Sequence, residues 1–215
     1  MMADQDRALP AQADAALIKE FKNSATAVIS DNLFRLPGAI GIKPFHRGGV
    51  MAGTALTVQT RAGDNLMIHK ALDLVRPGDV IVVDGGGDDT RALIGEIMAT
   101  IASTRGSAGL VIDGAIRDAG AISKSDFPVF ARAATHRGPY KNGPGNINVP
   151  VSIGGLVITP GDIVVGDDDG IVAFSQAIAG TLLQAVRSQE KKEAEILKSI
   201  HEGRYTGIYG KPSGA

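Results

Sequence analysis

Short runs of β-branched residues alternate with segments of helical periodicity along the 215-residue chain, and this alternation restricts the fold more than any other feature. The predicted strands lie at 49–60, 79–83, 109–113, 128–132, 156–158, 163–165 and 171–174. The predicted helices lie at 65–76, about 90–105 and about 175–202, with a helix or turn at 117–125 and one broken or two separate helices at about 14–35. Ser24 and Ser30 are candidate N-caps in that first helical region. This order predicts an α/β fold of packed sheet and helix layers, and residues 1–215 are expected to form a single domain.

Two segments share the pattern Pro-Gly-Asp followed by a buried strand, at 77–84 (PGDVIVVD) and 160–167 (PGDIVVGD). Pro-Gly favours a tight turn, so the repeat is interpreted as shared turn chemistry rather than as an internal duplication. Each copy leads into a Gly-rich or acidic segment, and loops at strand ends of α/β sheets commonly hold ligands. The second of these, Asp167-Asp168-Asp169-Gly170, is interpreted as a hairpin-like turn, with cation binding as the alternative.

Composition narrows the possible functions. The 22 Lys+Arg and 23 Asp+Glu residues give a formal net charge of −1, and the absence of a basic run argues against nucleic-acid binding. The chain has no cysteine, which excludes disulfides, thiolate nucleophiles and zinc–thiolate sites. No apolar stretch has the length of a membrane span, and the N-terminus lacks the signal-peptide pattern. We therefore expect a cytoplasmic protein that binds neither membrane nor nucleic acid.

The glycine run Gly85-Gly86-Gly87 precedes the predicted helix at about 90–105. A glycine-rich turn before a helix lets backbone N–H groups approach an anion, so a small-anion cradle is one interpretation. A flexible turn without chemical consequence is the other. The run lacks the lysine and spacing of a P-loop and is not a dinucleotide-binding fingerprint.

A stronger candidate is the pair Arg117-Asp118, which follows the predicted strand GLVIDG. Glu96 lies 21 residues before Arg117, early in the preceding predicted helix, and the topology is expected to bring the two carboxylates to one sheet edge. Two carboxylates suit a hard divalent cation such as Mg²⁺ or Mn²⁺. A neighbouring guanidinium is suited to binding a carboxylate or stabilising an enolate. An ordinary helix-capping ion pair is the alternative.

The remaining polar features are less specific. Asp31 is interpreted as a helix cap, with a place in the site as the alternative. His69 falls in an amphipathic helix and the other histidines are scattered, so no pair has zinc-ligand spacing. The Gly- and Asn-rich loop 136–150 is long enough to be functional and is equally consistent with a packed surface excursion.

The segment GEIMATIASTRGSAGLVIDGAIRDAGAI resembles the RraA-like family, which includes the class II 4-hydroxy-4-methyl-2-oxoglutarate aldolases. The resemblance extends to TAVISDNL, RPGDVIVVDGGG and VPVSIGGLVITPGDIVVGDDDGIV, and so covers nearly the whole chain. Aldolases of the family show an acidic residue, twenty intervening residues and then Arg-Asp. Glu96, Arg117 and Asp118 fit that spacing, although this chain carries Glu where those aldolases carry Asp.

The resemblance implies a layered α/β sandwich of the swivelling β/β/α type, assembled as a homotrimer or a hexamer with active sites between subunits. It implies that Asp118 anchors a Mg²⁺ or Mn²⁺ cofactor and that Arg117 contacts the substrate carbonyl. The helix start at Gly95, Glu96, Ile97 and Met98 is expected to bind the substrate carboxylate. The C-terminal helix of a neighbour is expected to contribute an acidic residue, aligned with Glu193; Glu190 is the rival, and a solvated charged face is the alternative for both.

These expectations define a pyruvate aldolase that cleaves a 4-hydroxy-2-oxo acid by retro-aldol chemistry, with oxaloacetate decarboxylation as a side activity. Glu96, with Glu193 from a neighbour, is expected to orient the metal-bound water that takes the C4 hydroxyl proton. The alternative is a non-catalytic RraA-type regulator that binds ribonuclease E or another protein. The Arg117-Asp118 pair favours the enzyme, because a binding protein has no need of a metal anchor beside an arginine. Methyl transfer from S-adenosylmethionine lacks support, since no nucleotide fingerprint is present.

Overall fold

The computed structural model describes residues 8–35 and 38–207; the predictions that concern residues 1–7, 36–37 and 208–215 lie outside this range. The strands are β1 (Lys43–Pro44), β2 (Met51–Thr60), β3 (Asp79–Asp84), β4 (Ala92–Ile94), β5 (Gly109–Ile116), β6 (Val129–Ala134), β7 (Gly145–Ile147), β8 (Val151–Ile153), β9 (Leu156–Ile158), β10 (Ile163–Asp167) and β11 (Gly170–Phe174). The helices are α1 (Ala15–Phe21), α2 (Thr26–Asp31), α3 (Leu66–Leu74), α4 (Glu96–Thr104), α5 (Ala119–Ile122) and α6 (Gln176–His201). The α/β prediction is confirmed.

A nine-stranded mixed sheet forms the centre of the described chain: seven strands follow the order β1-β6-β5-β3-β2-β10-β11, while β4 pairs with β5 and β7 pairs with β2 outside this path. The neighbours β2, β3, β5 and β6 run parallel, and β4 pairs in parallel with β5 outside this path. Because parallel strands end at the same edge, the segments that follow β4 and β5 meet there.

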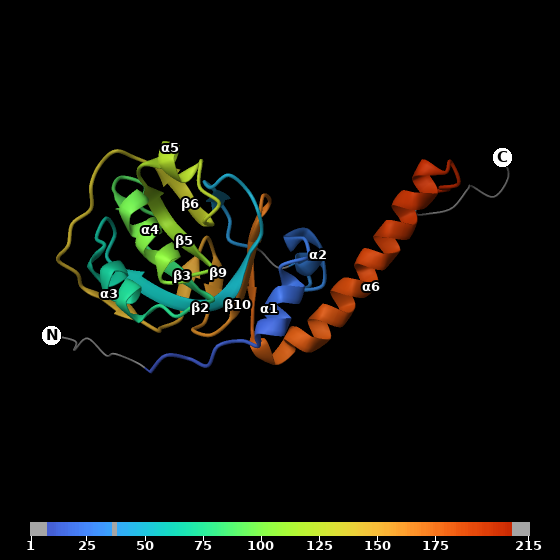
Figure 1. The fold of residues 1–215 in the computed structure, drawn as a ribbon, viewed down its shortest axis with the longest axis horizontal. Helices are drawn as coiled ribbons and strands as arrows, with labels where there is room; N and C mark the ends of the chain where they lie inside the picture. Colours follow the sequence, from blue (N-terminus) through green and yellow to red (C-terminus); the bar gives the residue numbers. More distant parts are fainter. Residues whose placement is uncertain (1–7, 36–37, 208–215) are drawn as a thin grey trace.

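The central strands are buried on both faces, so successive side chains enter different layers. Figure 1 shows helices α3 and α4 packed along one side of these strands. In β3, Ile81 and Val83 pack with α3 and α4, whereas Val80 and Val82 pack with the two-stranded β8–β9 sheet. Successive buried residues of β3 thus face opposite sides of the central sheet, where a helix layer covers one face and a second β layer covers the other. This is the β/β/α layering that the family resemblance implied.

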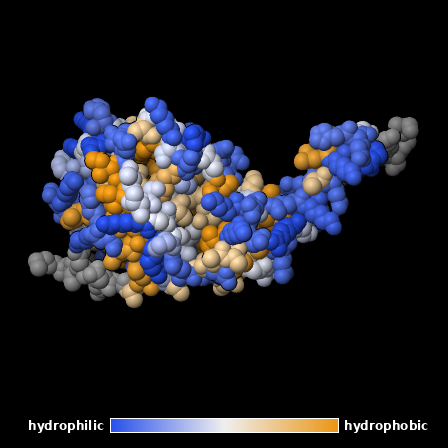
Figure 2. Space-filling model, viewed as in Figure 1, coloured by the Kyte–Doolittle hydropathy of each residue, from blue (hydrophilic) through white to orange (hydrophobic). Residues whose placement is uncertain are grey.

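A third cluster packs α1, α2 and the first half of α6 against β10 and β11. The buried residues of α6 end at Val186, and the remainder of the helix projects away from the body (Figure 1). That projecting half is largely hydrophilic in Figure 2, but Ile196, Leu197 and Ile200 are exposed on it. Of the helices described, none has the length and apolarity to cross a membrane.

The two Pro-Gly-Asp segments form equivalent turns. Gly78 (φ 86°) and Gly161 (φ 90°) both adopt the left-handed conformation that a type II turn requires of glycine. The strands that follow, β3 and β10, flank β2 on opposite sides, one parallel and one antiparallel to it. Because β3 and β10 run in opposite directions relative to β2, we interpret the repeat as shared turn chemistry rather than as an internal duplication.

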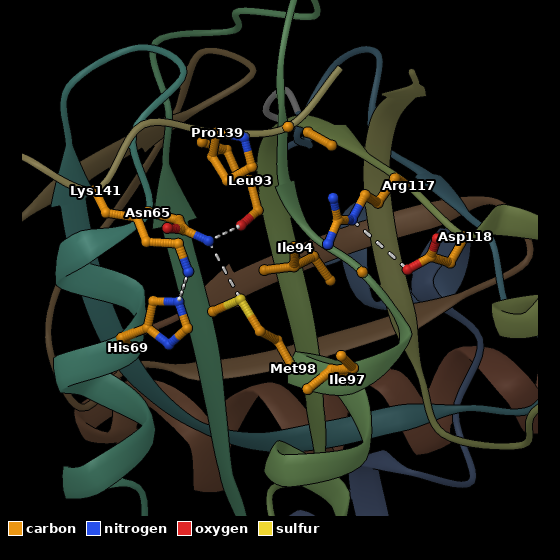
Figure 3. Close-up of a pocket in the computed structure, with 13 residues that line it drawn as sticks. Asn65, His69, Leu93, Ile94, Ile97, Met98, Arg117, Asp118, Pro139 and Lys141 are labelled. Carbon is orange, nitrogen blue, oxygen red and sulfur yellow. Dashed lines mark hydrogen bonds and ion pairs between the residues drawn. The ribbon is translucent and has the colours of Figure 1, made fainter. Parts of the chain in front are cut away.

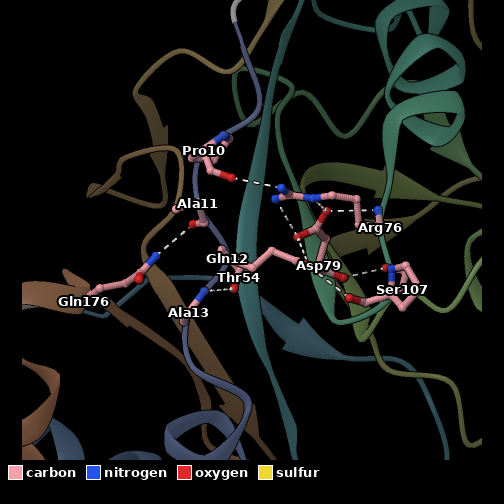
Figure 4. Close-up of polar contacts among 10 residues, drawn as sticks. Pro10, Ala11, Gln12, Ala13, Thr54, Arg76, Asp79, Ser107 and Gln176 are labelled. Atoms are coloured by element: carbon pink, nitrogen blue, oxygen red, sulfur yellow. Dashed lines mark hydrogen bonds and ion pairs between the residues drawn. The ribbon is translucent and has the colours of Figure 1, made fainter.

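The N-terminal segment crosses the edge of the sheet before α1 begins (Figure 4). The Gln12 side chain donates to the carboxylate of buried Asp79 (2.9 Å), and Ala13 N–H donates to the hydroxyl of Thr54 (3.0 Å). Arg76 donates to the carbonyl of Pro10 (2.9 Å) and also pairs with Asp79. Asp79 therefore ties the N-terminal segment to the turn before β3.

Several local predictions were wrong. The helix expected from about residue 90 begins only at Glu96, because 92–94 forms β4 beside β5. Neither Ser24 nor Ser30 is an N-cap: Asp14 caps α1, and the carboxylate of distant Asp167 accepts from Thr26 N–H (2.8 Å) at the start of α2. Asp31 ends α2 instead of capping it, and it pairs with Arg35 and Gln189. The short strands β1, β7 and β8 were not predicted.

Candidate active site

A cavity of about 280 Å³ opens at the carboxyl ends of β4 and β5 (Figure 3). Its walls come from the start of α3, strand β4, the first turn of α4, the Arg117-Asp118 pair and the loop after β6. The predicted site residues Gly95, Ile97, Met98, Arg117 and Asp118 all line it. The parallel pairing of β4 with β5 is what brings together residues more than twenty positions apart.

Arg117 and Asp118 lie together on one side of the cavity. Arg117 N–H donates to the carbonyl of Ile94 (2.9 Å), which fixes the pair against the end of β4. Arg117 Nε lies 3.7 Å from Asp118 Oδ2, and both side chains are a little under half exposed. No hydrogen bond joins the Arg117 guanidinium to any other described side chain or carbonyl, so its donors remain open toward a ligand.

Asp118 adopts a left-handed backbone conformation (φ 57°, ψ 31°), which is uncommon for a non-glycine residue and concentrates at functional sites. It precedes α5 but makes no side-chain cap there. Instead, Oδ2 accepts from the backbone N–H of Glu96 (3.1 Å) at the start of α4. Its other oxygen, Oδ1, accepts no hydrogen bond within the described residues. The capping interpretation therefore accounts for one oxygen of this carboxylate only.

The first turn of α4 presents backbone donors to the same space. Ile97 and Met98 lie in this turn, so their N–H groups have no intrahelical partner, and Gly95 provides no side-chain cap. Glycine is required at 95 by close approach: a Cβ there would lie 2.4 Å from Asp118 Oδ2 and 2.9 Å from Arg117 Cγ. The helix N-terminus, guanidinium and carboxylate thus converge only because residue 95 has no side chain.

Glu96 reaches this group through its backbone alone. Its exposed side chain lines a neighbouring hollow of about 260 Å³ between α4 and α5, together with Ala121 and Phe127. The expected juxtaposition with Arg117-Asp118 is therefore found for the Glu96 backbone, while the role of its carboxylate stays a prediction.

Glu193 and Glu190 do not line the cavity of their own chain. Both lie in the projecting half of α6, where Glu193 Oε1 accepts from the side chain of Gln189 (2.8 Å). The assignment of Glu193 to a neighbouring subunit's site stays a prediction.

The wall opposite Arg117 contains residues that sequence reasoning missed: Asn65, His69 and Lys141 (Figure 3). His69 Nε2 lies 3.3 Å from Lys141 Nζ. Burial, and secondarily the charge of Lys141, lowers the pKa of His69. The amphipathic pattern around His69 indicated only packing, and Lys141 lies in the loop 136–150, whose function the sequence left open.

The Gly85–Gly87 turn is not an anion cradle. Gly85 N–H and Gly87 N–H donate to the carbonyl of Asp113 (both 3.1 Å), and Gly86 N–H donates to the Asp84 side chain (2.9 Å). Its backbone donors are therefore occupied, and strand β4 rather than a helix follows it. The 167–170 turn is the β10–β11 hairpin, as predicted.

The cavity suits a hard divalent cation held mainly by water and ligand oxygens. Within residues 8–35 and 38–207, no three His, Asp or Glu side chains form a ready-made metal site. Asp118 is the one carboxylate of the described chain that lines this cavity, and it has an oxygen free. Mg²⁺ commonly binds through one or two carboxylates and keeps several waters, so this donor set fits Mg²⁺ or Mn²⁺ rather than a metal that needs a full protein cage.

Together, the parallel-stranded core and the cavity at its strand ends define an α/β protein that carries Arg117 and Asp118 at the open end of its sheet. Residues 26–173 match the family described as "RraA-like: Aldolase/RraA", and the chain belongs to this family. A protein of Halalkalibacterium halodurans named "Putative 4-hydroxy-4-methyl-2-oxoglutarate aldolase" is 43% identical over 192 residues, 89% of this chain and 91% of that protein. A protein of the same name from Ectopseudomonas mendocina is 40% identical over 116 residues, 54% of this chain and 72% of that protein.

Solved structures show the same fold. A crystal structure of an uncharacterized Pseudomonas syringae protein superposes with a TM-score of 0.80 at 29% identity, covering 90% of this chain and 96% of that one. A Streptomyces coelicolor protein, described as an unusual member of the RNase ES inhibitor RraA family, gives 0.77 at 26% identity, with 87% and 97% covered. The family thus includes both proteins named as aldolases and proteins named as ribonuclease inhibitors.

Proposed function

We propose that this protein is a divalent-metal-dependent pyruvate aldolase that cleaves a 4-hydroxy-2-oxo acid resembling 4-hydroxy-4-methyl-2-oxoglutarate. One observation carries the proposal: a guanidinium without hydrogen bonds, a carboxylate with a free oxygen and a helix N-terminus whose second and third N–H groups lack intrahelical partners face one cavity. The relatives named as aldolases support the same reaction class.

Different groups of the chain bind the substrate and stabilise the charge that develops during cleavage. The N–H groups of Ile97 and Met98 bind the substrate's C1 carboxylate at the positive end of α4. Arg117 donates to the 2-keto oxygen and stabilises the negative charge that develops there when the C3–C4 bond breaks. Asp118 would hold a divalent cation, which supplies Lewis acidity to the same carbonyl.

Cleavage also requires removal of the C4 hydroxyl proton. Glu96 lies at the start of α4, where the pyruvyl carboxylate is bound, and we assign to its exposed carboxylate the orientation of the water that accepts this proton. This role requires the side chain to turn from the hollow between α4 and α5 toward the cavity. We assign a supporting role to Glu193 of a neighbouring subunit in a homotrimer or hexamer. The projecting half of α6 supports such an assembly, because among the described residues none after Val186 in this helix is buried, and Ile196, Leu197 and Ile200 are exposed.

The opposite wall favours a substrate with a second acidic group. With the pyruvyl end fixed by Arg117 and α4, the substituents on C4 would extend toward Lys141 and His69, which lie on the opposite side of the cavity in Figure 3. The Lys141 ammonium is a donor and a positive charge at that end, and it suits a distal carboxylate. Oxaloacetate carries the same two charges and passes through the same enolate, so its decarboxylation is expected as a side activity.

The test is pyruvate release from a panel of 4-hydroxy-2-oxo acids and oxaloacetate, with Mg²⁺, with Mn²⁺ and with EDTA. We expect release that EDTA abolishes, and Arg117→Lys should lower kcat/KM about 10²–10³-fold because the planar fork is lost. A folded wild-type protein that releases no pyruvate would contradict the proposal and favour the alternative of a regulator acting by contact with ribonuclease E. Retention of most activity in Arg117→Lys would refute the role assigned to Arg117.

A further inference from the structure

Asp64, between β2 and α3, is a fully buried carboxylate that contacts two elements of the cavity's wall. Its Oδ1 accepts from Leu66 N–H (2.9 Å) at the start of α3, the helix that carries His69. Its Oδ2 accepts from Asn142 N–H (2.7 Å) and Gly143 N–H (3.0 Å) in the loop after β6. One side chain therefore joins the helix and the loop that together form the wall opposite Arg117.

Lys141 lies between two of these attachments. On its N-terminal side, Tyr140 N–H donates to the Gly63 carbonyl (2.8 Å) and the Tyr140 carbonyl accepts from Asn65 N–H (3.0 Å). On its C-terminal side, Asn142 N–H binds Asp64. The backbone on both sides of Lys141 is thus fixed against residues 63–65, and this leaves the Lys141 side chain in the cavity beside His69.

Asp64 is held in its ionised form despite burial. Burial raises its pKa, but the N–H donors of Leu66, Asn142 and Gly143, together with the charge of Arg61, outweigh this effect and lower the pKa below its ordinary value. Arg61 Nη2 lies 3.5 Å from Asp64 Oδ2. The carboxylate therefore accepts these hydrogen bonds throughout the neutral pH range.

We propose that Asp64 is a positioning residue that places the Lys141 ammonium for the distal carboxylate of the substrate, and so determines the preference for doubly charged 4-hydroxy-2-oxo acids. The proposal rests on the proposed function. Asp64 does not touch the substrate; it acts through the loop. Replacement by Asn turns one acceptor into a donor, so either Leu66 N–H or the N–H groups of Asn142 and Gly143 face another donor. In both orientations the bridge between α3 and the loop that carries Lys141 is broken.

Asp79 provides a matched control. It is also fully buried and also pairs with an arginine three residues earlier, at 3.0 Å from Arg76 (Figure 4). It too accepts a backbone N–H, from Arg76 (2.9 Å). However, it joins the N-terminal segment to the turn before β3 and does not line the cavity. Asp79→Asn therefore removes a comparable buried ion pair, but it does not alter the loop that carries Lys141.

The experiment compares Asp64→Asn with Asp79→Asn in two measurements. One is KM and kcat for the dianion 4-hydroxy-4-methyl-2-oxoglutarate; the other is the inhibition constant of pyruvate, a monoanion that occupies only the Arg117 end. For Asp64→Asn we expect KM to rise about tenfold, the scale of one lost charge-assisted contact, with kcat and the pyruvate constant within about twofold of wild type. Asp79→Asn should leave all three within that range. In a Lys141→Met background, Asp64→Asn should add nothing further to KM, because both changes remove one interaction.

An equal KM in the two variants, or a full additional loss in the Lys141→Met background, would overturn the proposal. If Asp64→Asn does not fold, the same comparison on Asp64→Glu and Asp79→Glu decides, since the longer carboxylate keeps its charge and shifts the loop. Failure of the proposed function itself gives a different result, because the wild-type protein would then release no pyruvate at all.

Discussion

Gly95→Ala tests the convergence of helix, guanidinium and carboxylate by adding one methyl group at its centre. The new Cβ would lie 2.4 Å from Asp118 Oδ2, whereas ordinary contact begins at 3.4 Å, so the carboxylate must retreat by about 1.0 Å. The Cβ would also lie 2.9 Å from Arg117 Cγ, which moves the guanidinium in the same step. The hydrogen bond from Glu96 N–H to Asp118 is then lost.

The expected effect is large on turnover and small on stability. A displacement of about 1 Å at reacting groups costs about 10²-fold in rate, equivalent to about 2.7 kcal/mol of transition-state stabilisation. The half-exposed Asp118 can move toward solvent, and Gly95 has an extended backbone (φ −149°) that alanine also adopts. Loss of glycine at this N-cap should therefore cost about 1 kcal/mol, or about 3 °C in Tm.

The assay is kcat/KM for pyruvate release at saturating Mg²⁺, with Tm measured by circular dichroism. Gly120→Ala is the control, because Gly120 lies two residues after Asp118 with open space where its Cβ would be. The control should keep wild-type activity. Near-wild-type kcat/KM in folded Gly95→Ala would refute the argument that the three groups act from the positions seen here.

Three further outcomes follow from the same site. Asp118→Ala should raise the Mg²⁺ or Mn²⁺ concentration for half-maximal activity with little change in Tm; an unchanged metal response with a lowered Tm would leave only the capping role. Glu96→Gln should slow turnover at saturating metal whereas Glu96→Asp retains it, and activity of the Gln variant within about twofold of wild type would assign Glu96 to the helix terminus alone. Burial and, secondarily, the charge of Lys141 lower the pKa of His69 in the folded protein. As the pH falls through about 6.5, His69 is therefore protonated in the unfolded chain before it is protonated in the folded protein. The unfolding free energy from urea titrations should therefore decrease from about pH 7.5 to 5.5, and this component should be missing in His69→Phe; an identical pH dependence in both proteins would contradict the shift.

The local sequence pattern was sufficient to predict those elements whose conformation depends mainly on their own residues. The turns at Gly78 and Gly161 were predictable because only glycine accepts their left-handed backbone, and the strands after them because their β-branched runs are buried on both faces. The placement of Arg117-Asp118 directly after a buried strand was likewise predictable. The local sequence shows that the Arg117-Asp118 pair follows the end of a strand. In a parallel sheet, this position also determines the edge of the sheet at which the pair lies.

Groups whose partners are distant in sequence could not be predicted. The cap of α2 comes from Asp167, 141 residues away, and the donors of the Gly85–Gly87 turn are occupied by the Asp113 carbonyl of the adjacent strand. Strand β4 was taken for helix because its short apolar run has no periodicity of its own, and only pairing with β5 extends it.

The candidate site divides in the same way. The sequence by itself determined that a guanidinium and a carboxylate follow β5 and that Glu96 lies early in the helix that precedes this strand. Tertiary structure decided that the Glu96 side chain enters a separate hollow, and that Asp64 brings Lys141 and His69 to the opposite wall. The physical reason is that side-chain direction and loop placement depend on hydrogen bonds between segments that become neighbours only when the sheet has formed. The periodicity of residues along the chain does not predict these hydrogen bonds.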